Sequence, residues 1–204
     1  EAGFKVVELH FAHGYLASSF MSPLSNHRED EYGGSLENRC RFALETITEI
    51  RNAIPESAHL FVRISSSEFV EGGWDIEDSV QIAKWMKDAG VDLVDASAGG
   101  NSADQVLKLS PGYQVPFADA IRNQAGIMTA AVGLITEAKK AEEILQAGQA
   151  DAVFIGRELM RNPYWSLYAQ AQLDGESDRW AKQYKPSSFD SKYTGPSEVI
   201  STSS

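Results

Sequence analysis

Short apolar segments alternate with longer amphipathic segments along most of this chain. The apolar segments are four to six residues long and rich in β-branched or aromatic side chains. Buried parallel strands have this character, because other elements cover both of their faces. We predict strands at 5–9, 60–64, 91–96, 127–132 and 152–155.

Apolar residues between these strands recur every three or four positions, the spacing of a helix with one buried face. Ser35, Asp75 and Thr136 each stand just before such a segment and can cap its first turn. Pro116 and Pro163 suit first helical positions, the latter after Asn162 as a cap. The predicted helices are 36–54, a helix beginning after Asp75, 117–123, 137–147 and 163–173.

A weak internal repeat bears on where the fold begins. Residues 1–8 resemble 88–95 and 146–154, where an amphipathic helix precedes the glycine and a strand follows it. Glycine at such a place ends a helix in a left-handed turn. The pattern therefore predicts that residues 1–3 are the last turn of a helix that begins upstream. We accordingly expect the chain to be part of a longer fold.

Strand and helix alternation predicts an α/β fold with a parallel sheet and right-handed crossovers. An open doubly wound sheet and a (β/α)8 TIM barrel both fit. A whole barrel takes about 250 residues, so a barrel would have only its last five βα units here. In that case residues 1–173 would form the C-terminal part of the barrel, and in either case residues 174–204 are expected to form a polar tail.

Charge, cysteine count and hydropathy argue against some binding partners and cellular locations. The 204 residues carry a net charge of -11, which disfavours nucleic-acid and anionic-membrane surfaces. Cys40 has no second cysteine to pair with, so the cytoplasm is the expected compartment. No apolar run approaches the ~18 residues of a transmembrane helix.

The first strand ends in three polar rings, His10, His13 and Tyr15. Ligands of parallel α/β folds bind where the strands end. The histidines can donate hydrogen bonds to a carbonyl or an anion, and the tyrosine can give up a phenolic proton. Their spacing alone leaves three interpretations open: a metal pair, structural histidines, or a site for an organic substrate.

Arg63 lies in a strand so apolar that its charge needs a partner. It forms either an ion pair with Glu8 or Asp95, or a cation beneath an electron-rich ligand. Glycine turns follow the last two strands at Gly133 and at Gly156, before Arg157. Paired phosphate-binding loops after the last strands are a recurrent barrel feature, and we predict one here.

Residues 19–38 form a long segment that is usually functional or held by its own contacts in a compact fold. We expect Arg28 and Asp30 to hold this loop as an internal ion pair.

These residues resemble the old yellow enzyme family of FMN-dependent ene-reductases, in particular the bacterial and fungal branch with a His-x-x-His-Gly-Tyr motif. The resemblance covers about residues 1–173. It rests on three long stretches and three short ones: His10-Phe11-Ala12-His13-Gly14-Tyr15-Leu16, Phe20-Met21-Ser22-Pro23-Leu24-Ser25-Asn26, Asp30-Glu31-Tyr32-Gly33-Gly34-Ser35-Leu36-Glu37-Asn38-Arg39, and the shorter Val62-Arg63, Ala131-Val132-Gly133 and Ile155-Gly156-Arg157. It favours the organic-substrate interpretation of the histidines.

The resemblance implies FMN across the mouth of a barrel and NADPH, or NADH, as reductant. It implies that Arg63 lies beside the flavin N1 and O2 atoms, and that Gly133, Gly156 and Arg157 hold the phosphate. It further implies an enone substrate bound by His10, Phe11, Ala12 and His13. Tyr15, with the two histidines, would then be catalytic, protonating the α carbon after hydride from flavin N5 reaches the β carbon.

Two departures from the family pattern qualify these expectations. The first three strands have no counterpart, so the alternative is an inactive half-barrel that needs a partner chain to complete its sheet. Some members form homo-oligomers in which a C-terminal arginine reaches a neighbouring site. Here Gln183-Tyr184-Lys185-Pro186 has no arginine at the matching place, which argues against this interface role and leaves open whether the chain forms a homo-oligomer.

Overall fold

A computed structural model describes residues 2–175, 179 and 181 of the chain. The predicted tail from 182 onward, including residues 183–186, lies outside the described residues.

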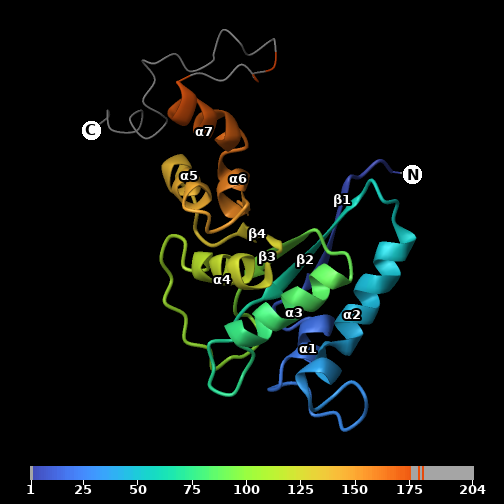
Figure 1. Ribbon diagram of the computed structural model, residues 1–204. Helices are drawn as coiled ribbons and strands as arrows, with labels where there is room; N and C mark the ends of the chain where they lie inside the picture. The colour runs from blue at the N-terminus through green and yellow to red at the C-terminus, as the bar shows by residue number, and fades with distance from the viewer. Residues whose placement is uncertain (1, 176–178, 180, 182–204) are drawn as a thin grey trace. The chain divides into compact units, whose positions relative to one another are not determined.

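Five parallel strands form one sheet in the order of the sequence (Figure 1). A doubly wound sheet reverses its strand order at a switch point, whereas this sheet adds each strand beside the previous one, as a barrel does. The barrel prediction is confirmed for five consecutive βα units. The strands are β1 (Val6–Phe11), β2 (His59–Ser65), β3 (Leu93–Ser97), β4 (Met128–Ala131) and β5 (Ala152–Val153).

The helices follow the prediction in their main features. Ser35 accepts a hydrogen bond from Asn38 N, and Asp75 accepts from Glu77 N and Asp78 N, so both act as predicted caps. The helices are α1 (Leu16–Met21), α2 (Leu36–Ala53), α3 (Ile76–Asp88), α4 (Val115–Ala125), α5 (Ala138–Gln146), α6 (Arg157–Arg161) and α7 (Trp165–Asp174).

The predicted start of the last helix is wrong by two residues. Asn162 ends α6 instead of capping α7, because its N–H donates to Glu158 O at 2.7 Å. The Asn162 carbonyl then accepts from Trp165 N at 3.0 Å, and α7 begins there. The short helices α1 and α6 were not predicted, since five or six residues do not show a helical period.

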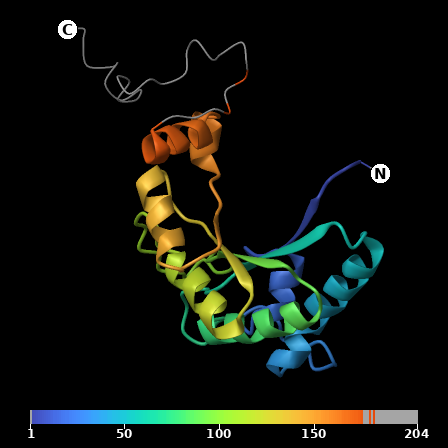
Figure 2. The same ribbon diagram turned by 45° about the horizontal axis from the view of Figure 1, so that its top comes forward.

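One face of the sheet is covered by helices α2, α3 and α4, which lie together beneath it in Figure 2. Leu60, Val62 and Ile64 of β2 point to these helices and have no exposed surface. Thr129 of β4 does likewise and donates its hydroxyl proton to Ala118 O of α4 at 3.2 Å. This apolar layer is the core that fixes the strands.

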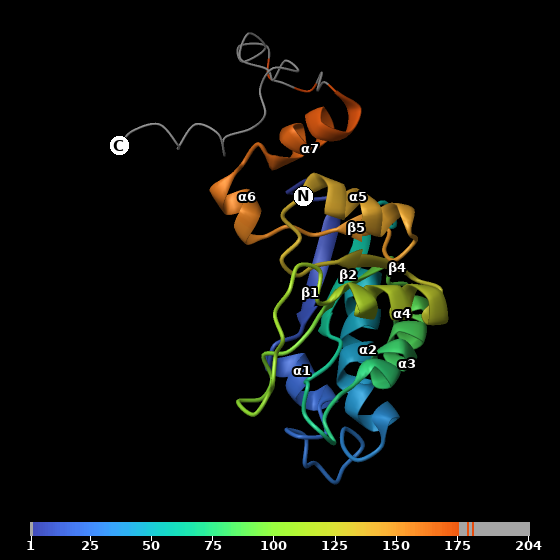
Figure 3. The same ribbon diagram turned by 90° about the vertical axis from the view of Figure 1, so that its left-hand side faces the viewer.

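The opposite face, which we call the inner face, carries polar residues in register. β1 and β2 lie side by side (Figure 3) and pair His10 with Arg63, while β2 and β3 pair Arg63 with Asp95. The next pair on the same face of these strands is Ser65 with Ser97. Side chains of paired residues point to the same face of a parallel sheet, so a polar row crosses three strands near their carboxyl ends.

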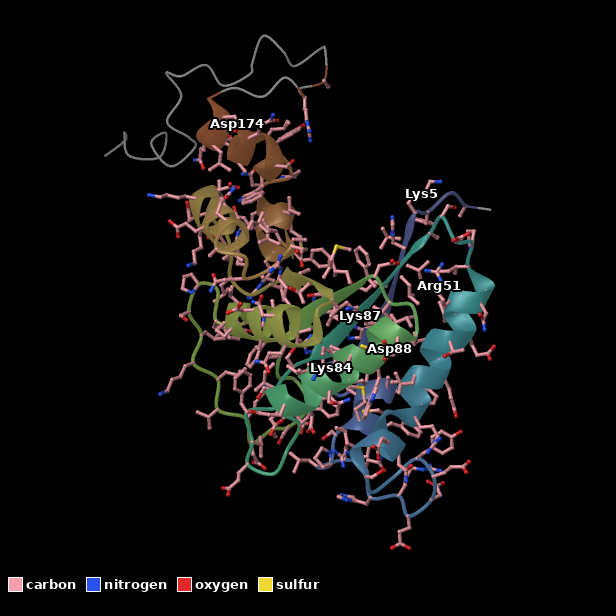
Figure 4. The ribbon with its side chains drawn as sticks, viewed as in Figure 1. Lys5, Arg51, Lys84, Lys87, Asp88 and Asp174 are labelled. Atoms are coloured by element: carbon pink, nitrogen blue, oxygen red, sulfur yellow. The ribbon has the colours of Figure 1, made fainter. Side chains whose placement is uncertain are left out.

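The opposite ends of the strands are joined by a contact that we call the Arg–Asp clamp. Asp92, just before β3, accepts from Leu60 N of β2 at 2.8 Å and lies 3.7 Å from the guanidinium of Arg51. Arg51 lies near the C-terminal end of α2 (Figure 4) and also donates to Ala58 O at 3.0 Å. The clamp ties one helix to the starts of two strands.

A second clamp repeats the first one two strands later. Asp151, just before β5, accepts from Thr129 N of β4 at 3.0 Å and pairs with Arg122 of α4 at 3.0 Å. Arg122 also donates to Gly148 O at 3.0 Å. The internal repeat in the sequence therefore has a structural counterpart.

The described residues divide into two compact bodies, residues 2–135 with 144–154 and residues 136–143 with 155–175. The first contains the sheet. Within the second, Trp165 Nε1 donates to Thr136 O at 2.6 Å, and Arg161 pairs with Glu158 at 2.7 Å. Among the described residues, no helix has the length and apolar character needed to cross a bilayer.

Candidate active site at the ends of the first three strands

Three rings predicted to form a site lie together after β1. The His10 ring lies 5.6 Å from the His13 ring and 5.4 Å from the Tyr15 ring, centroid to centroid. His13 and Gly14 adopt left-handed backbone conformations, which turn the chain sharply after the strand. A side chain on Gly14 would also come within 3.2 Å of Gly100 O, so glycine fits this turn.

His13 is anchored to the strands beside it. Its Nδ1 lies 2.9 Å from Gly99 O, which can only accept, so this contact needs a proton on Nδ1. Its backbone N–H donates to Ser65 Oγ at 2.9 Å, and Ser65 Oγ donates to Gly99 O at 2.8 Å. Its Nε2 lies 3.3 Å from Ser97 Oγ. The ring is therefore held in one orientation.

His10 lies in a different environment. Partial burial lowers its pKa, and the nearby His13 and Arg63 lower it further. The imidazole is therefore neutral at neutral pH and can donate one hydrogen bond without carrying charge. Tyr15 is 65% exposed and offers its phenol beside this ring.

Arg63 forms the ion pair predicted with Asp95, and not the alternative with Glu8. Its Nη2 also donates to Ser97 Oγ at 3.1 Å. The Arg63 side chain remains 24% exposed on the inner face. The ion-pair interpretation is confirmed, and the exposed part of the cation leaves room for the ligand interpretation as well.

The remaining predicted site residues have varied positions. Phe11 and Ala12 are buried, with 5% and 0% of their surface exposed, so their side chains do not share the solvent exposure of Tyr15. Gly133 follows β4 in the first body, whereas Gly156 and Arg157 belong to the second. The described residues hold no group of three or more His, Cys, Asp or Glu side chains that could bind a metal.

The sequence analysis missed the roles of Ser65, Ser97 and Gln114. Ser97 Oγ contacts Arg63, His13 and the Gln114 side chain, the last at 3.3 Å. A signal was available for the serines, because Ser65 ends the strand next to the one that carries His10 and Ser97 ends the strand after that. Gln114 lies in a loop, and no feature of the sequence indicated its role.

The loop prediction is confirmed. Arg28 and Asp30 form an exposed ion pair in which Arg28 Nε donates to Asp30 Oδ1 at 2.9 Å. Asn26 fastens the same loop by donating to Phe20 O and Tyr32 O at 2.6 and 2.7 Å.

The family model of the NADH:flavin oxidoreductase / NADH oxidase family matches residues 1–176. This chain belongs to that family. It is 54% identical over 177 residues to the NADPH dehydrogenase of Bacillus subtilis strain 168, covering 86% of this chain and 51% of that protein. It is 48% identical over 186 residues to that of Listeria monocytogenes serotype 4a, covering 90% and 53%.

Solved structures of the family agree with these relatives. A 2-naphthoyl-CoA reductase complex matches 85% of this chain and 27% of its own, with 28% identity and a TM-score of 0.75. Morphinone reductase matches 86% and 45%, with 25% identity and a TM-score of 0.65. The old yellow enzyme resemblance is confirmed, and this family is one of enzymes. The chain spans about half the length of the curated relatives it matches.

FMN is the cofactor of this flavin oxidoreductase family, and NADPH is the reductant in the names of its relatives. The residues present fit FMN. Arg63 offers a partly exposed cation on the inner face. A Cβ on Gly156 would meet nothing within 4 Å, so the space over this backbone is free. Gly133 has a φ of 114°, and a Cβ there would lie 2.7 Å from Gln114 Nε2, so this turn requires glycine.

Proposed function

We propose that this chain supplies the substrate and flavin side of an ene-reductase that reduces the C=C bond of α,β-unsaturated carbonyl compounds with NAD(P)H. The observation that carries the proposal is the grouping of His10, His13 and Tyr15 beside Arg63 at the carboxyl ends of β1 and β2. These groups combine donors for a carbonyl oxygen, a proton donor, and a cation for an electron-rich ring.

His10 and His13 bind the carbonyl oxygen of the substrate in this proposal, and His13 donates from Nε2 as the imidazolium, because its Nδ1 proton is directed at Gly99 O. Negative charge develops on that oxygen as the double bond accepts hydride, and preoriented donors stabilise it. His10 donates as a neutral imidazole, consistent with its lowered pKa. Gly99 and Ser65 hold the His13 ring, so it need not reorganise during the reaction. Phe11 and Ala12 complete the substrate-binding segment.

Tyr15 delivers the proton that completes the reduction. The β carbon receives hydride and the α carbon receives the phenolic proton, so the double bond gains two hydrogen atoms. The exposure of Tyr15 lets solvent reprotonate it between turnovers.

FMN, when bound, supplies the hydride chemistry. Arg63 lies beside the flavin ring in this proposal, whereas Gly133, Gly156 and Arg157 hold the phosphate through backbone N–H groups and a guanidinium. Removing the Arg157 guanidinium should then weaken FMN binding by roughly 1.5–3 kcal/mol, the scale of a hydrogen bond to a charged group.

The first test asks which form of the protein holds FMN. Residues 1–204 are purified, mixed with FMN and freed of excess, and the visible spectrum is recorded. In parallel the chain is joined to the part of the Bacillus subtilis NADPH dehydrogenase that it does not match, which gives a completed protein. A retained flavin band identifies the holoprotein.

The second test follows the holoprotein by stopped flow with NADPH and then with 2-cyclohexen-1-one. Bleaching by NADPH and recovery by the enone, with the saturated ketone as product, support the proposal. A flavin reduced by NADPH but recovered by oxygen alone would refute C=C reduction. Flavin held by the completed protein but not by the isolated chain would support the alternative that this half needs a partner.

A further inference from the structure

We propose that Asp95 is a positioning residue that lowers the electron affinity of the bound flavin by opposing the positive charge of Arg63. The inference rests on the proposed function, in which Arg63 lies beside the flavin ring.

The placement of Asp95 is unusual for a carboxylate. It has no exposed surface, and it lies next to Arg63 in the register of β2 and β3. One carboxylate oxygen pairs with Arg63, and the other, Oδ1, is buried with no hydrogen-bond partner among the described residues. A buried carboxylate with one oxygen unpartnered is costly, so stability alone does not account for it.

Asp95 acts on the inner face together with its neighbours. Two alternate residues of β3 hold the guanidinium of Arg63. Asp95 forms an ion pair with it, and Ser97 accepts a hydrogen bond from it at 3.1 Å. Asp95 supplies charge and direction, whereas Ser97 supplies direction alone. Substituting Asp95 or Ser97 separately therefore distinguishes the effect of charge from the effect of orientation on the Arg63 guanidinium.

The charge balance of flavin reduction gives Asp95 its effect. Hydride from NADPH brings two electrons and one proton to a neutral oxidised flavin, so the reduced ring carries one negative charge until it gains a second proton. Arg63 stabilises that charge, and Asp95 offsets part of the stabilisation through a poorly solvated interior. The reduced flavin is thereby a stronger hydride donor toward the substrate than it would be beside an uncompensated arginine.

The test measures flavin reduction potential and sulfite affinity in the holoprotein with Asp95→Asn. Sulfite adds to oxidised flavin and leaves a negative charge on the ring, so its dissociation constant reports the same electrostatics without turnover. We expect the equilibrium with NADPH to shift toward reduced flavin by roughly tenfold, about 30 mV for a two-electron couple. Sulfite should bind tighter by a similar factor, with enone reduction slower and reduction by NADPH not slower.

Ser97→Ala is the matched control, because it removes the other contact to Arg63 without changing charge. It should change the equilibrium constant for flavin reduction by NADPH by less than about threefold. Asp88→Asn, which removes an exposed charge at the end of α3 (Figure 4), should leave both readouts unchanged. An unchanged potential in Asp95→Asn, or an equal shift in Ser97→Ala, overturns the proposal.

Asp95→Asn leaves the charge of Arg63 without its partner, so a second variant is needed in case this one does not fold. Arg63→Gln with Asp95→Asn leaves neither charge, and its potential should lie above that of Arg63→Gln alone. Equal potentials in these two variants overturn the proposal. Failure of the proposed function is distinct, since then no form retains FMN or no enone is reduced.

Discussion

His10 and His13 are three residues apart but have different surroundings. His13 is fixed by Gly99 and Ser65, whereas no hydrogen bond to the His10 side chain is present among the described residues. His10 can therefore adjust to a ligand and His13 provides a fixed reference. Tyr15, next to His10, is the one ionisable oxygen of the three rings.

Tyr15→Phe tests the proton-donor role at this scale. The ring remains but the phenolic proton is lost, so general-acid assistance of roughly 10²–10⁴-fold should disappear from enone reduction. Flavin reduction by NADPH should change by less than about twofold, because it uses no proton from this group. Stopped-flow traces of the two half-reactions separate the effects, and equal losses in both would contradict the assignment.

Glu8 gives a prediction about pH and stability. Partial burial raises its pKa, and the neighbouring Asp95 raises it further, while Arg63 lowers it. A carboxyl whose folded pKa is raised stabilises the fold below its unfolded value near 4.5 and loses that contribution as pH rises through the folded pKa. The ionised carboxylate of Glu8 therefore destabilises the folded chain at neutral pH.

Glu8→Gln should consequently stabilise the chain at pH 7, by less than about 1 kcal/mol because the side chain is only partly buried and solvent screens its charge. The gain should vanish below the unfolded pKa. Urea unfolding at both pH values checks this, with Glu45→Gln on α2 as a control of equal charge. A gain that persists in acid would contradict the electrostatic explanation.

How far the sequence predicts the site depends on the kind of contact. His10, Tyr15 and Arg63 could be placed because each stands at or near the end of an apolar strand. The partner of Arg63 stayed open between Glu8 and Asp95, because both flank it and only strand register decides. Gly99 and Gln114 act through loop conformation, which hydrophobic periodicity does not encode.

At the scale of elements, the two Arg–Asp clamps join helices to strand starts. Each aspartate satisfies a backbone N–H of one strand while it stands directly before the next. Each arginine adds a charge and reaches a loop carbonyl. The clamps therefore set the register of neighbouring strands at the end opposite the site.

Asp92→Ala and Asp151→Ala should each lower the free energy of unfolding by about 1–3 kcal/mol, because each leaves a backbone donor and an arginine without their acceptor. Urea unfolding of the two variants checks this, and Asp88→Ala, at an exposed position that ends α3, is the control (Figure 4). A loss no larger than that of the control would show that the clamps are incidental.

Element boundaries were harder to predict than the elements. Strong caps such as Ser35 and Asp75 were read correctly, because their side chains act on their own helices. Asn162 was misread, since α6 occupies the residues before it and uses Asn162 as its end. A five-residue helix gave too little period to reveal this.

At the scale of the whole molecule, the sheet ends in two edge strands, β1 and β5. Val6 of β1 is 43% exposed and Met128 of β4 is 52% exposed, both at the ends of their strands away from the site. Further strands cover such surfaces in a closed barrel.

The isolated chain should therefore bind a hydrophobic dye such as ANS and self-associate as its concentration rises. The completed protein should bind at most about one-third as much dye per chain. Dye fluorescence and light scattering across a concentration series measure this. Equal dye binding by the two forms would indicate that the exposed residues are covered in some other way.

The repeated clamp has a consequence for how this fold can be divided. One clamp closes α2 to β3 and the next closes α4 to β5, and the residues between them, 98–114, belong to neither. Each clamped pair is thus a module that carries its own register. A cut between residues 102 and 110 severs no clamp and leaves Gly99 with His13, so two halves made as separate chains should reassemble, and modules from relatives should be exchangeable at this junction.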